Sequence, residues 1–423
     1  MKLYVVIVVL GVVLAVSYLV FEAWVTANPP TYSDNVPTTT FTLMLQGFAV
    51  RERTKSRMLG IEQDFFRGLN DEANPAKSKN VILTGSTSGL GFGAATRLLA
   101  AGGGRLLFLP CRKCGDRAFV DKLKKRLSKA AKNLILKKVP EVAATGNVDV
   151  GVERLVFLEM DLGDLSSIDA GVLAIKSKLQ SLPGEERIDI LINNAGLVNI
   201  YGAKTVDGFE KAFGVNYLGT AYFTEKLNDS HLFSVYDPIH EFPRVVMVSS
   251  EEHRLQKTIT LPGQSSFGEF FDFGLLTGGQ MEGYAYSKFL LTSYSHELSK
   301  RWEGKLRVFD ICPGPVASDI AADAPWPINK LVSKWMKYTF VSGEDAALPL
   351  LNLAFYKHPK HRSDDGSKPL IHFHMGEERP ASRESQISST GNDLWRLTHE
   401  LLAKHNRPIP SDDRRGRTKS NIE

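Results

Sequence analysis

The chain has 423 residues, of which 43% are apolar and 23% charged, proportions that are ordinary for a globular protein. This length suffices for one large domain with appendages or for two domains. A net charge of +5 is too diffuse to indicate a nucleic-acid partner, although it suits anionic ligands or a membrane surface. Three cysteines are too few for a disulfide framework, and the Cys111-x-x-Cys114 pair lacks the partners that a redox or metal role would need.

The N-terminus holds an uninterrupted apolar run, Leu3 to Phe21, without a charge. It is long enough to cross a hydrocarbon core of about 30 Å as a helix, whereas the apolar part of a cleaved signal peptide usually spans roughly 7–15 residues. We therefore expect residues 1–27 to form a transmembrane anchor or signal-anchor, with cleavage near Ala27 as the alternative. The protein is then a single-pass membrane protein, expected in the endoplasmic reticulum. Residues 28–77 are interpreted as a linker followed by amphipathic helices.

The first motif follows a short apolar run, Val81 to Thr84, that is typical of a buried parallel strand. A glycine turn follows directly, and a helical segment then runs from Phe92 to Ala101. A strand, a glycine turn and a helix start bring backbone N–H groups and the positive helix end to a phosphate. We therefore assign cofactor binding to the residues of this turn: Gly85, Ser86, Ser88, Gly89, Leu90 and Gly91.

The next predicted strand, Arg105 to Pro110, leads to the residues that should choose between NAD and NADP. An NAD site places Asp or Glu about twenty residues after the glycines, to bind the ribose 2′-hydroxyl. Arg112 lies there instead, and a cation suits a 2′-phosphate, so the sequence favours NADP(H). Asp116 is near enough to this position that NAD(H) remains the alternative cofactor. A basic helical stretch follows within residues 113–154; a solvated face is its simplest interpretation, and contact with anionic lipid headgroups is the alternative.

Two further predicted strands end in residues that suit a cofactor. Residues 155–160 are followed by Asp161 and Leu162, whose carboxylate and backbone are placed to reach the adenine. Residues 188–192 are followed by a polar and small group: Asn193, Asn194, Ala195 and Gly196. The asparagines can tie strand ends together, and the Ala-Gly pair lets the cofactor approach closely. Asn216 lies inside the next helix, where Asn is unfavourable, and we expect it to bend the helix and bind a water.

The fifth predicted strand, Arg244 to Val248, ends in Ser249 and Ser250. One of these hydroxyls should emerge at the carboxyl end of the sheet, where open α/β folds bind ligands. Four phenylalanines, Phe267, Phe270, Phe271 and Phe273, lie in the long segment that follows. We interpret that segment as an apolar wall beside the active site, with an ordinary hydrophobic loop core as the alternative.

A Tyr-x-x-x-Lys pair, Tyr284 and Lys288, then lies on a predicted helix, where residues four apart share one face. A phenol pKa near 10 is too high for easy proton exchange at neutral pH. An ammonium beside the phenol favours the phenolate and lowers that pKa. Tyr284 is therefore a candidate general acid/base, although this spacing alone is common on solvated helices.

The last part of the chain supplies a sixth strand, residues 306–311, and a turn through Pro313, Gly314 and Val316 that is placed to cap a nicotinamide. Trp326, Leu331, Trp335 and Met336 are interpreted as a lid over the substrate. Residues 342–357 predict a helix, 369–374 a closing strand and 394–404 an amphipathic helix between loose polar segments. His372 and His374 are interpreted as lying on the open face of a strand end, and no metal site is expected.

These blocks resemble the classical short-chain dehydrogenase/reductases in order and rough spacing over residues 78–350. Within that family the chain looks most like the retinol dehydrogenase branch, which has a similar Cys111-Arg112 pair and Val215–Gly219 segment. It departs from that branch in the 113–154 insertion and in Glu251-Glu252 after the serines. The resemblance implies a Rossmann α/β fold, a doubly wound parallel sheet of about seven strands in residues 78–375, with a C-terminal helix and loose tail in 376–423.

The resemblance also implies the roles of the catalytic residues. Ser250 polarises the substrate oxygen, Tyr284 is the general acid/base, Lys288 holds the nicotinamide ribose and lowers the tyrosine pKa, and Asn216 fixes a relay water. The expected activity interconverts an alcohol and a carbonyl on a lipophilic substrate, such as a retinoid, a sterol or another lipid. A double-bond reductase similar to protochlorophyllide reductase and a non-catalytic nucleotide-binding scaffold are the alternatives. A homodimer is kept open, and no nucleic-acid partner is expected.

Overall fold

The computed structural model describes residues 77–138, 149–181, 187–199, 203–234, 242–256, 258–259, 279–314, 316–317, 341–355 and 372–409. Across these ranges no helix combines the length and the apolar character that crossing a bilayer requires. The apolar run from Leu3 to Phe21, the four phenylalanines of the 251–283 segment and the predicted lid around Trp335 lie outside the described residues.

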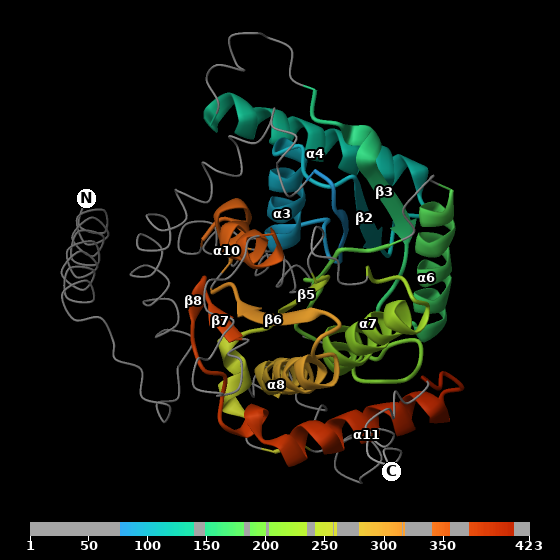
Figure 1. The fold of residues 1–423 in the computed structure, drawn as a ribbon, viewed down its shortest axis with the longest axis vertical. Helices are drawn as coiled ribbons and strands as arrows, with labels where there is room; N and C mark the ends of the chain where they lie inside the picture. Colours follow the sequence, from blue (N-terminus) through green and yellow to red (C-terminus); the bar gives the residue numbers. More distant parts are fainter. Residues whose placement is uncertain are drawn as a thin grey trace, which may run out of the picture.

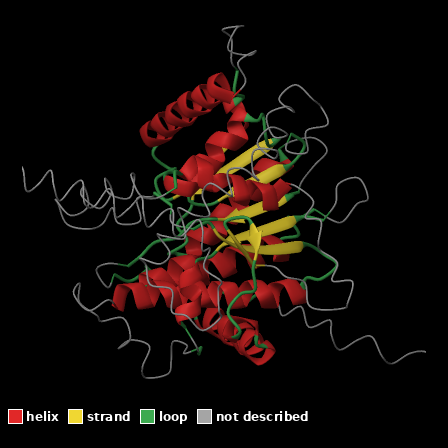
Figure 2. Cartoon of the chain, turned by 90° about the vertical axis from the view of Figure 1, so that its left-hand side faces the viewer, coloured by secondary structure: helices red, strands yellow, loops and turns green. Residues whose placement is uncertain are grey.

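One eight-stranded sheet organises the described part of the chain, in the order β3-β2-β1-β4-β5-β6-β7-β8. All neighbouring strands pair in parallel except β7 and β8, which are antiparallel. Figure 2 shows these strands side by side with helices packed around them. The strands are Asn80–Leu83, Leu106–Cys111, Leu155–Glu159, Ile190–Asn193, Arg244–Val248, Arg307–Cys312, His372–His374 and Glu377–Glu378.

This topology confirms the predicted Rossmann-like α/β fold, with one strand more than the seven expected. The extra strand is β8, whose two residues are too short to leave a periodic signal in the sequence. The chain reverses its direction of strand addition between β1 and β4, which are neighbours in the sheet. In open α/β sheets, ligands bind outside the carboxyl ends of the strands at such a switch point.

Helices cover both faces of the sheet (Figure 1). One apolar core joins the sheet to α3 (Gly89–Ala100), α4 (Arg117–Lys138) and α10 (Gly343–Phe355). The other core joins it to α6 (Leu165–Gln180), α7 (Thr220–Asp229) and α8 (Gly279–Arg301). The two cores explain why the inner strands are continuous apolar runs: a parallel strand covered on both faces has no solvent side to keep polar.

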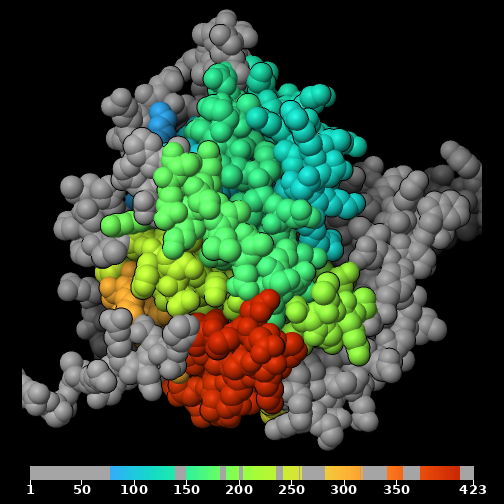
Figure 3. All heavy atoms as spheres, turned by 90° about the vertical axis from the view of Figure 1, so that its right-hand side faces the viewer, coloured from blue at the N-terminus to red at the C-terminus, as the bar shows by residue number. Residues whose placement is uncertain are grey.

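The C-terminal segment packs onto the second core. Helix α11 (Ser388–Lys404) lies against α8, and the Tyr217 hydroxyl shares a hydrogen bond with Thr398 on it. Arg407, just beyond the helix, forms an ion pair with Asp169 of α6 at 2.8 Å. The segment forms the red part of the surface in Figure 3. Residues 378–392, which the sequence suggested were loose, contain the end of β8, a short 3-10 helix and the first turn of α11.

Candidate active site

The glycine turn after β1 packs so closely on the rest of the protein that it has no room for side chains at Gly85 and Gly91. Gly85 has a φ of +69°, which favours glycine. A Cβ on Gly91 would lie 2.2 Å from the carbonyl oxygen of Gly85 and 2.4 Å from Nδ2 of Asn194. The first turn of α3 carries no acidic residue, and Ser88 at its N-cap makes no side-chain capping bond. The N–H groups of this helix start are therefore presented to the turn without a protein anion.

Asn194 ties the glycine turn to the end of β4. Its Nδ2 donates to the carbonyl oxygens of Thr84 at 2.9 Å and Gly85 at 3.2 Å. The Thr84 hydroxyl in turn accepts from the backbone N–H groups of Asn194 and Ala195, both at 3.0 Å. The expected role of an asparagine at this strand end is therefore confirmed for Asn194. Gly196 beside it is exposed, as close approach of a ligand requires.

These residues fit the phosphates of a dinucleotide. Glycine at position 91 lets the start of α3 pack directly on the turn, and the N–H groups of that helix start have neither a side-chain cap nor an acidic neighbour in the first turn. Ser86 is fully buried, and its hydroxyl has no hydrogen-bond partner among the described residues. Leaving a buried hydroxyl unpaired costs free energy, so a ligand oxygen at this turn would supply what the protein does not.

Arg112 lies at the tip of a turn closed by a disulfide between Cys111 and Cys114. The N–H of Cys114 also donates to the Cys111 carbonyl oxygen at 3.2 Å. Because no disulfide was expected from the sequence, this bond is a correction: the cross-link joins the two ends of a single turn and needs no larger framework. Arg112 and its neighbour Lys113 are exposed.

Asp116, the residue that kept NAD(H) open, is engaged elsewhere. Its Oδ1 accepts from the N–H groups of Ala118 at 2.9 Å and Phe119 at 3.3 Å, so it caps the start of α4. A carboxylate that caps a helix is stabilised there and is less free to bind a ribose hydroxyl. The end of β2 therefore presents cations towards solvent.

Asp161 and Leu162 follow β3 as predicted. Oδ1 of Asp161 accepts from the N–H of Gly163 at 2.8 Å, which fixes the carboxylate at the strand end. The Leu162 carbonyl packs against Gly219, where a Cβ would lie only 1.9 Å from that oxygen. These contacts hold the strand end against the helix that carries Asn216.

Asn216 lies in a π-helical turn, Phe213–Gly219, so the expected irregularity of this helix is confirmed. Its amide exchanges two 2.9 Å hydrogen bonds with the backbone of Leu197 and donates to the Ser287 hydroxyl at 3.0 Å. The side chain therefore links the segment after β4 to α8, and its donors and acceptor are all used by protein groups. The relay water stays a prediction and would need other atoms to hold it.

The two serines after β5 point in different directions. Ser249 is buried and shares a 2.5 Å hydrogen bond with the Thr292 hydroxyl of α8. Ser250 is partly exposed, caps the following 3-10 helix Glu251–Leu255 by accepting from the N–H of Glu252, and forms a hydrogen bond with Tyr284. The structure thus brings Ser250, and not Ser249, to the tyrosine.

Tyr284 and Lys288 lie one turn apart on α8 and face the same side. The Lys288 Nζ lies 5.7 Å from the centre of the Tyr284 ring and donates to the Val248 carbonyl oxygen at 2.7 Å. Burial raises the pKa of the Tyr284 hydroxyl above its ordinary value, and the hydrogen bond with Ser250 opposes that rise. The net shift of this pKa in the protein alone is therefore upward, opposite to the lowering expected from Lys288, because burial of the hydroxyl dominates.

The turn after β6 lies beside these residues. The Cys312 sulfur accepts from the N–H groups of Glu251 at 3.3 Å and Gly314 at 3.4 Å, which joins this turn to the end of β5. Gly314 has a φ of +77° and packs on Met375. Pro313 is partly exposed, and Val316 forms a β-bridge with Val341. Capping of a nicotinamide by this turn stays a prediction.

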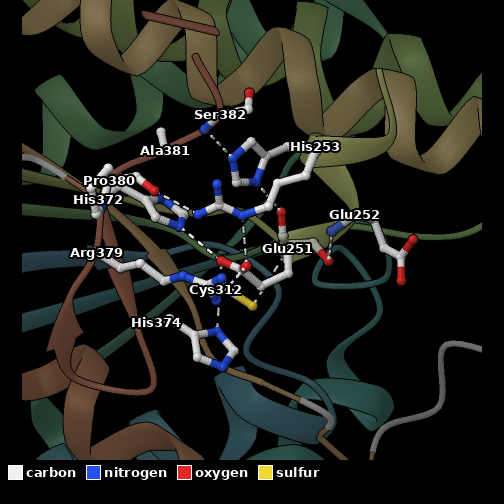
Figure 4. Close-up of polar contacts among 12 residues, drawn as sticks. Glu251, Glu252, His253, Cys312, His372, His374, Arg379, Pro380, Ala381 and Ser382 are labelled. Atoms are coloured by element: carbon white, nitrogen blue, oxygen red, sulfur yellow. Dashed lines mark hydrogen bonds and ion pairs between the residues drawn. The ribbon is translucent and has the colours of Figure 1, made fainter. Parts of the chain in front are cut away.

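His372 and His374 are buried, so their expected position on an open strand face is wrong. Figure 4 shows them around Glu251, which points into the protein, while Glu252 points away. Ligand atoms of Glu251, His253 and His372, and of Glu251, Cys312 and His374, lie within 4.8 Å of one another. Both oxygens of Glu251 already accept from cationic side chains, so we assign no metal here. The signals that could have revealed this cluster are Asp310 inside an apolar strand and Glu251 beside the serines.

Comparison with known proteins gives matches over the same region. A family model described as short chain dehydrogenase matches residues 79–256, which include Ser250 and end before Tyr284. Retinol dehydrogenase 14 of Mus musculus is 30% identical over 289 residues, which cover 66% of this chain and 70% of the relative. Short-chain dehydrogenase/reductase prx1 of Penicillium roqueforti is 29% identical over 253 residues, 59% of this chain and 61% of the relative. The chain thus spans less than two thirds of that fungal protein.

Among solved structures, a putative uncharacterized protein from Mycobacterium paratuberculosis is similar, with 21% identity and a TM-score of 0.49. The match covers 79% of this chain and 96% of the other.

Proposed function

Because the chain belongs to the short-chain dehydrogenase/reductase family, we propose that it is a membrane-anchored, NADP(H)-dependent enzyme that interconverts an alcohol and a carbonyl on a lipophilic substrate. The family makes it an oxidoreductase that uses a nicotinamide cofactor and is related to retinol dehydrogenases. The observation that carries the proposal is the convergence of Ser250, Tyr284 and Lys288 beside the carboxyl ends of β4 and β5.

The proposed roles follow from the contacts of these side chains. Ser250 and Tyr284 share a hydrogen bond, so one substrate oxygen placed against both would accept from both. Tyr284 gives its proton to the developing alkoxide in reduction and takes one from the alcohol in oxidation. The cofactor supplies or accepts the hydride. Lys288 lies next to exposed Gly196, where a Cβ would be 3.3 Å from Nζ, so the ammonium is placed beside the surface that a cofactor ribose would approach.

The choice of NADP(H) is supported by the end of β2. Arg112 and Lys113 form the tip of the disulfide-closed turn and are exposed, while Asp116 caps α4. A guanidinium is well suited to a phosphate because it presents several N–H donors in a fixed plane. The 2′-phosphate of NADP(H) would therefore find donors at this strand end, whereas one oxygen of the Asp116 carboxylate is already engaged in capping α4.

The lipophilic substrate is supported by three features of the sequence and its relatives. The apolar run from Leu3 to Phe21 is long enough to hold the enzyme at a bilayer, the endoplasmic reticulum being our proposed membrane. The segment between Ser250 and Tyr284 is rich in phenylalanine. Relatives named retinol dehydrogenase match the chain. We propose a retinoid, a sterol or another lipid carbonyl as the substrate class.

Replacement of Tyr284 by Phe tests the proposal. The full chain in detergent is assayed for NADPH oxidation with a panel of retinal, sterol ketones and long-chain aldehydes, and for the reverse reaction with the alcohols. Because Phe has no proton to exchange, we expect turnover to fall by about 10²–10⁴-fold. Tyr286→Phe, two residues along the same helix, is the matched control and should keep turnover. Equal activity of the wild type and Tyr284→Phe would refute the catalytic role of Tyr284. Reduction of a ring double bond, with no turnover of the carbonyls or alcohols, would favour the alternative of a double-bond reductase.

A further inference from the structure

A series of buried, alternating charges extends from β6 towards the surface, and Figure 4 shows its outer part around Glu251. It begins with Asp310 on β6 and His372 on β7, which are register partners in neighbouring strands and are both fully buried. A carboxylate oxygen of Asp310 lies 3.3 Å from Nδ1 of His372. The other ring nitrogen of His372, Nε2, lies 3.1 Å from Oε1 of Glu251. His372 therefore lies between two carboxylates, which favours the imidazolium form.

Two arginines, bound to Glu251, form the outer end of this series of charges. The Nε of Arg254 and an Nη of Arg379 each donate to Oε2 of Glu251 at 2.8 Å. Both arginine side chains are partly exposed, at 12% and 16%, whereas Glu251 is almost fully buried. The order of charges from the surface inward is thus two cations, an anion, a cation and the anion of Asp310. A buried charge is tolerated only when such partners compensate it.

Asp310, the inner end of this series of charges, faces the side of α8 that carries Tyr284 and Lys288. Tyr284, Lys288 and Thr292 are spaced four residues apart, so they share one face of the helix. Asp310 is the register partner of Met247 on β5, and the next residue of that strand, Val248, accepts from the Lys288 ammonium, so the carboxylate lies in the part of the sheet that α8 covers. Lys288 is 3% exposed. Its ammonium donates to the Val248 carbonyl oxygen, and Asp310 is the carboxylate whose charge acts on it most strongly.

The electrostatics agree with this geometry. Burial lowers the pKa of Lys288 to about 8, and the Asp310 carboxylate opposes that fall. Burial would raise the pKa of Asp310, but the positive charge of His372, whose Nδ1 lies 3.3 Å from the carboxylate, outweighs burial and lowers the pKa. Burial also acts against a charged His372, yet Asp310 and Glu251 outweigh burial and raise the His372 pKa to about 9. Lysine, aspartate and histidine are thus all charged at neutral pH.

The other titratable groups around this series of charges are either neutral at neutral pH or point away from the series. Burial lowers the pKa of His253 to about 3 and of His374 to about 4, so both rings are neutral. Burial raises the pKa of the Cys312 thiol to about 12. Burial and the charge of Glu251 raise the pKa of Glu252, whose side chain points away from the cluster. Asp310 is therefore the carboxylate that acts most strongly on Lys288.

We propose that Asp310, held ionised by His372 and through it by Glu251, is a positioning residue that keeps the Lys288 ammonium protonated beside Tyr284. The proposal rests on the function proposed for Lys288. Neither Asp310 nor His372 contacts the substrate oxygen in this scheme, and both act through the lysine. Their role is to let a nearly fully buried amine keep its proton at the pH of catalysis.

Asp310→Asn tests the proposal, since it removes the charge and keeps the size and hydrogen-bonding capacity of the side chain. Two properties of the full chain are measured between pH 6 and 10. The first is the rate of Lys288 acetylation by acetic anhydride in the cofactor-free protein, followed by mass spectrometry. The second is NADPH affinity, followed by fluorescence. We expect the midpoint of Lys288 titration to fall by about one pH unit or more, and the pH at which NADPH affinity declines to fall with it.

Two further variants separate this role from a structural one. Glu225→Gln removes another buried carboxylate that faces α8, where Glu225 bonds to Tyr294 and pairs with His399 at 2.7 Å. It should leave the Lys288 midpoint unchanged. His372→Gln removes the cation that holds Asp310 ionised and should lower the midpoint in the same direction, which keeps the test available if Asp310→Asn does not fold. Asp310→Glu should restore the wild-type midpoint.

A Lys288 midpoint that is the same in the wild type, Asp310→Asn and His372→Gln would overturn the proposal. Wild-type protein that neither binds NADPH nor turns over lipid carbonyls would instead refute the proposed function, while the acetylation measurement would still report on Asp310 and Lys288.

Discussion

The Lys288 ammonium lies 5.7 Å from the centre of the Tyr284 ring and is hydrogen-bonded to the carbonyl oxygen of Val248 at 2.7 Å. In this arrangement the lysine is tied to the end of β5, and the tyrosine hydroxyl is bonded to Ser250. Burial therefore dominates the tyrosine pKa and raises it. A phenol with a raised pKa gives up its proton less readily at neutral pH, so Tyr284 is protonated in the protein alone but is a weak proton donor there.

The two serines after β5 should behave differently when each is replaced by Ala. Ser250→Ala removes a donor to the substrate oxygen, and loss of such a donor typically costs about 10²–10³-fold in kcat. Ser249→Ala leaves the buried Thr292 hydroxyl without this partner, which should cost about 1–3 kcal/mol of stability, with kcat close to that of the wild type. Steady-state kinetics and urea unfolding of both variants check this. A large fall in kcat for Ser249→Ala alone would reverse the assignment.

Arg112→Asp should shift the cofactor preference towards NADH. The substitution replaces a cation by an anion at the exposed tip of the turn after β2, where it would repel a 2′-phosphate and accept from a ribose hydroxyl. We expect the ratio of kcat/KM for NADPH over NADH to fall by at least about tenfold, which corresponds to about 1.4 kcal/mol. Lys125→Asp, the same charge change on an exposed position of α4, is the control. An unchanged ratio in Arg112→Asp would count against NADP(H).

The fold was largely predictable because its inner strands carry their own signal. Residues such as Val81 and Val246 lie in strands that are buried along their whole length, so the sequence is continuously apolar there. The glycine turn was predictable for a similar reason, since Gly85 and Gly91 meet local steric requirements. Strand β8 and the start of α11 were missed because they depend on contacts with distant parts of the chain.

The candidate site was predictable where residues act locally and unpredictable where burial decides their chemistry. Tyr284 and Lys288 share a helix face by spacing alone. The sign of the Tyr284 pKa shift depends instead on how the sheet and the 3-10 helix enclose it, which no spacing reveals. His372 has an unremarkable place in the sequence, and only the pairing of β6 with β7 puts it between Asp310 and Glu251.

The cross-link between Cys111 and Cys114 gives a prediction about thiols and stability. Thiol titration of the unfolded, unreduced protein should find one cysteine, Cys312, and three after reduction by a dithiol. Because the disulfide closes a loop of only a few residues, its removal in the Cys111→Ser, Cys114→Ser double variant should cost about 2 kcal/mol. The turn that carries Arg112 also loses its constraint, so NADPH affinity should weaken while NADH affinity changes little. Three reactive thiols before reduction would contradict the bond.

The buried His372 should make stability depend on pH in a defined direction. Its pKa in the folded protein is about 9, above the ordinary value of 6.5, because Asp310 and Glu251 outweigh the effect of burial. A group with a raised folded pKa contributes stability that is fully present below the unfolded pKa and is lost as pH rises through the folded pKa. The contribution of His372 is therefore complete below about pH 6.5 and is lost by about pH 9.

Lys288 acts in the opposite direction, so the measurement must isolate the histidine. The folded pKa of Lys288 is lowered by burial to about 8 from 10.5, and its cost to stability is relieved as pH rises between these values. Urea unfolding of Lys288→Met with and without His372→Gln at several pH values isolates the histidine, because the lysine is then absent from both proteins. The difference in unfolding free energy should shrink by about 3 kcal/mol between pH 6.5 and 9, as a pKa shift of this size implies. A difference that stayed constant with pH would mean that His372 is neutral in the folded protein, and the series of charges that begins at Asp310 would then lack its central cation.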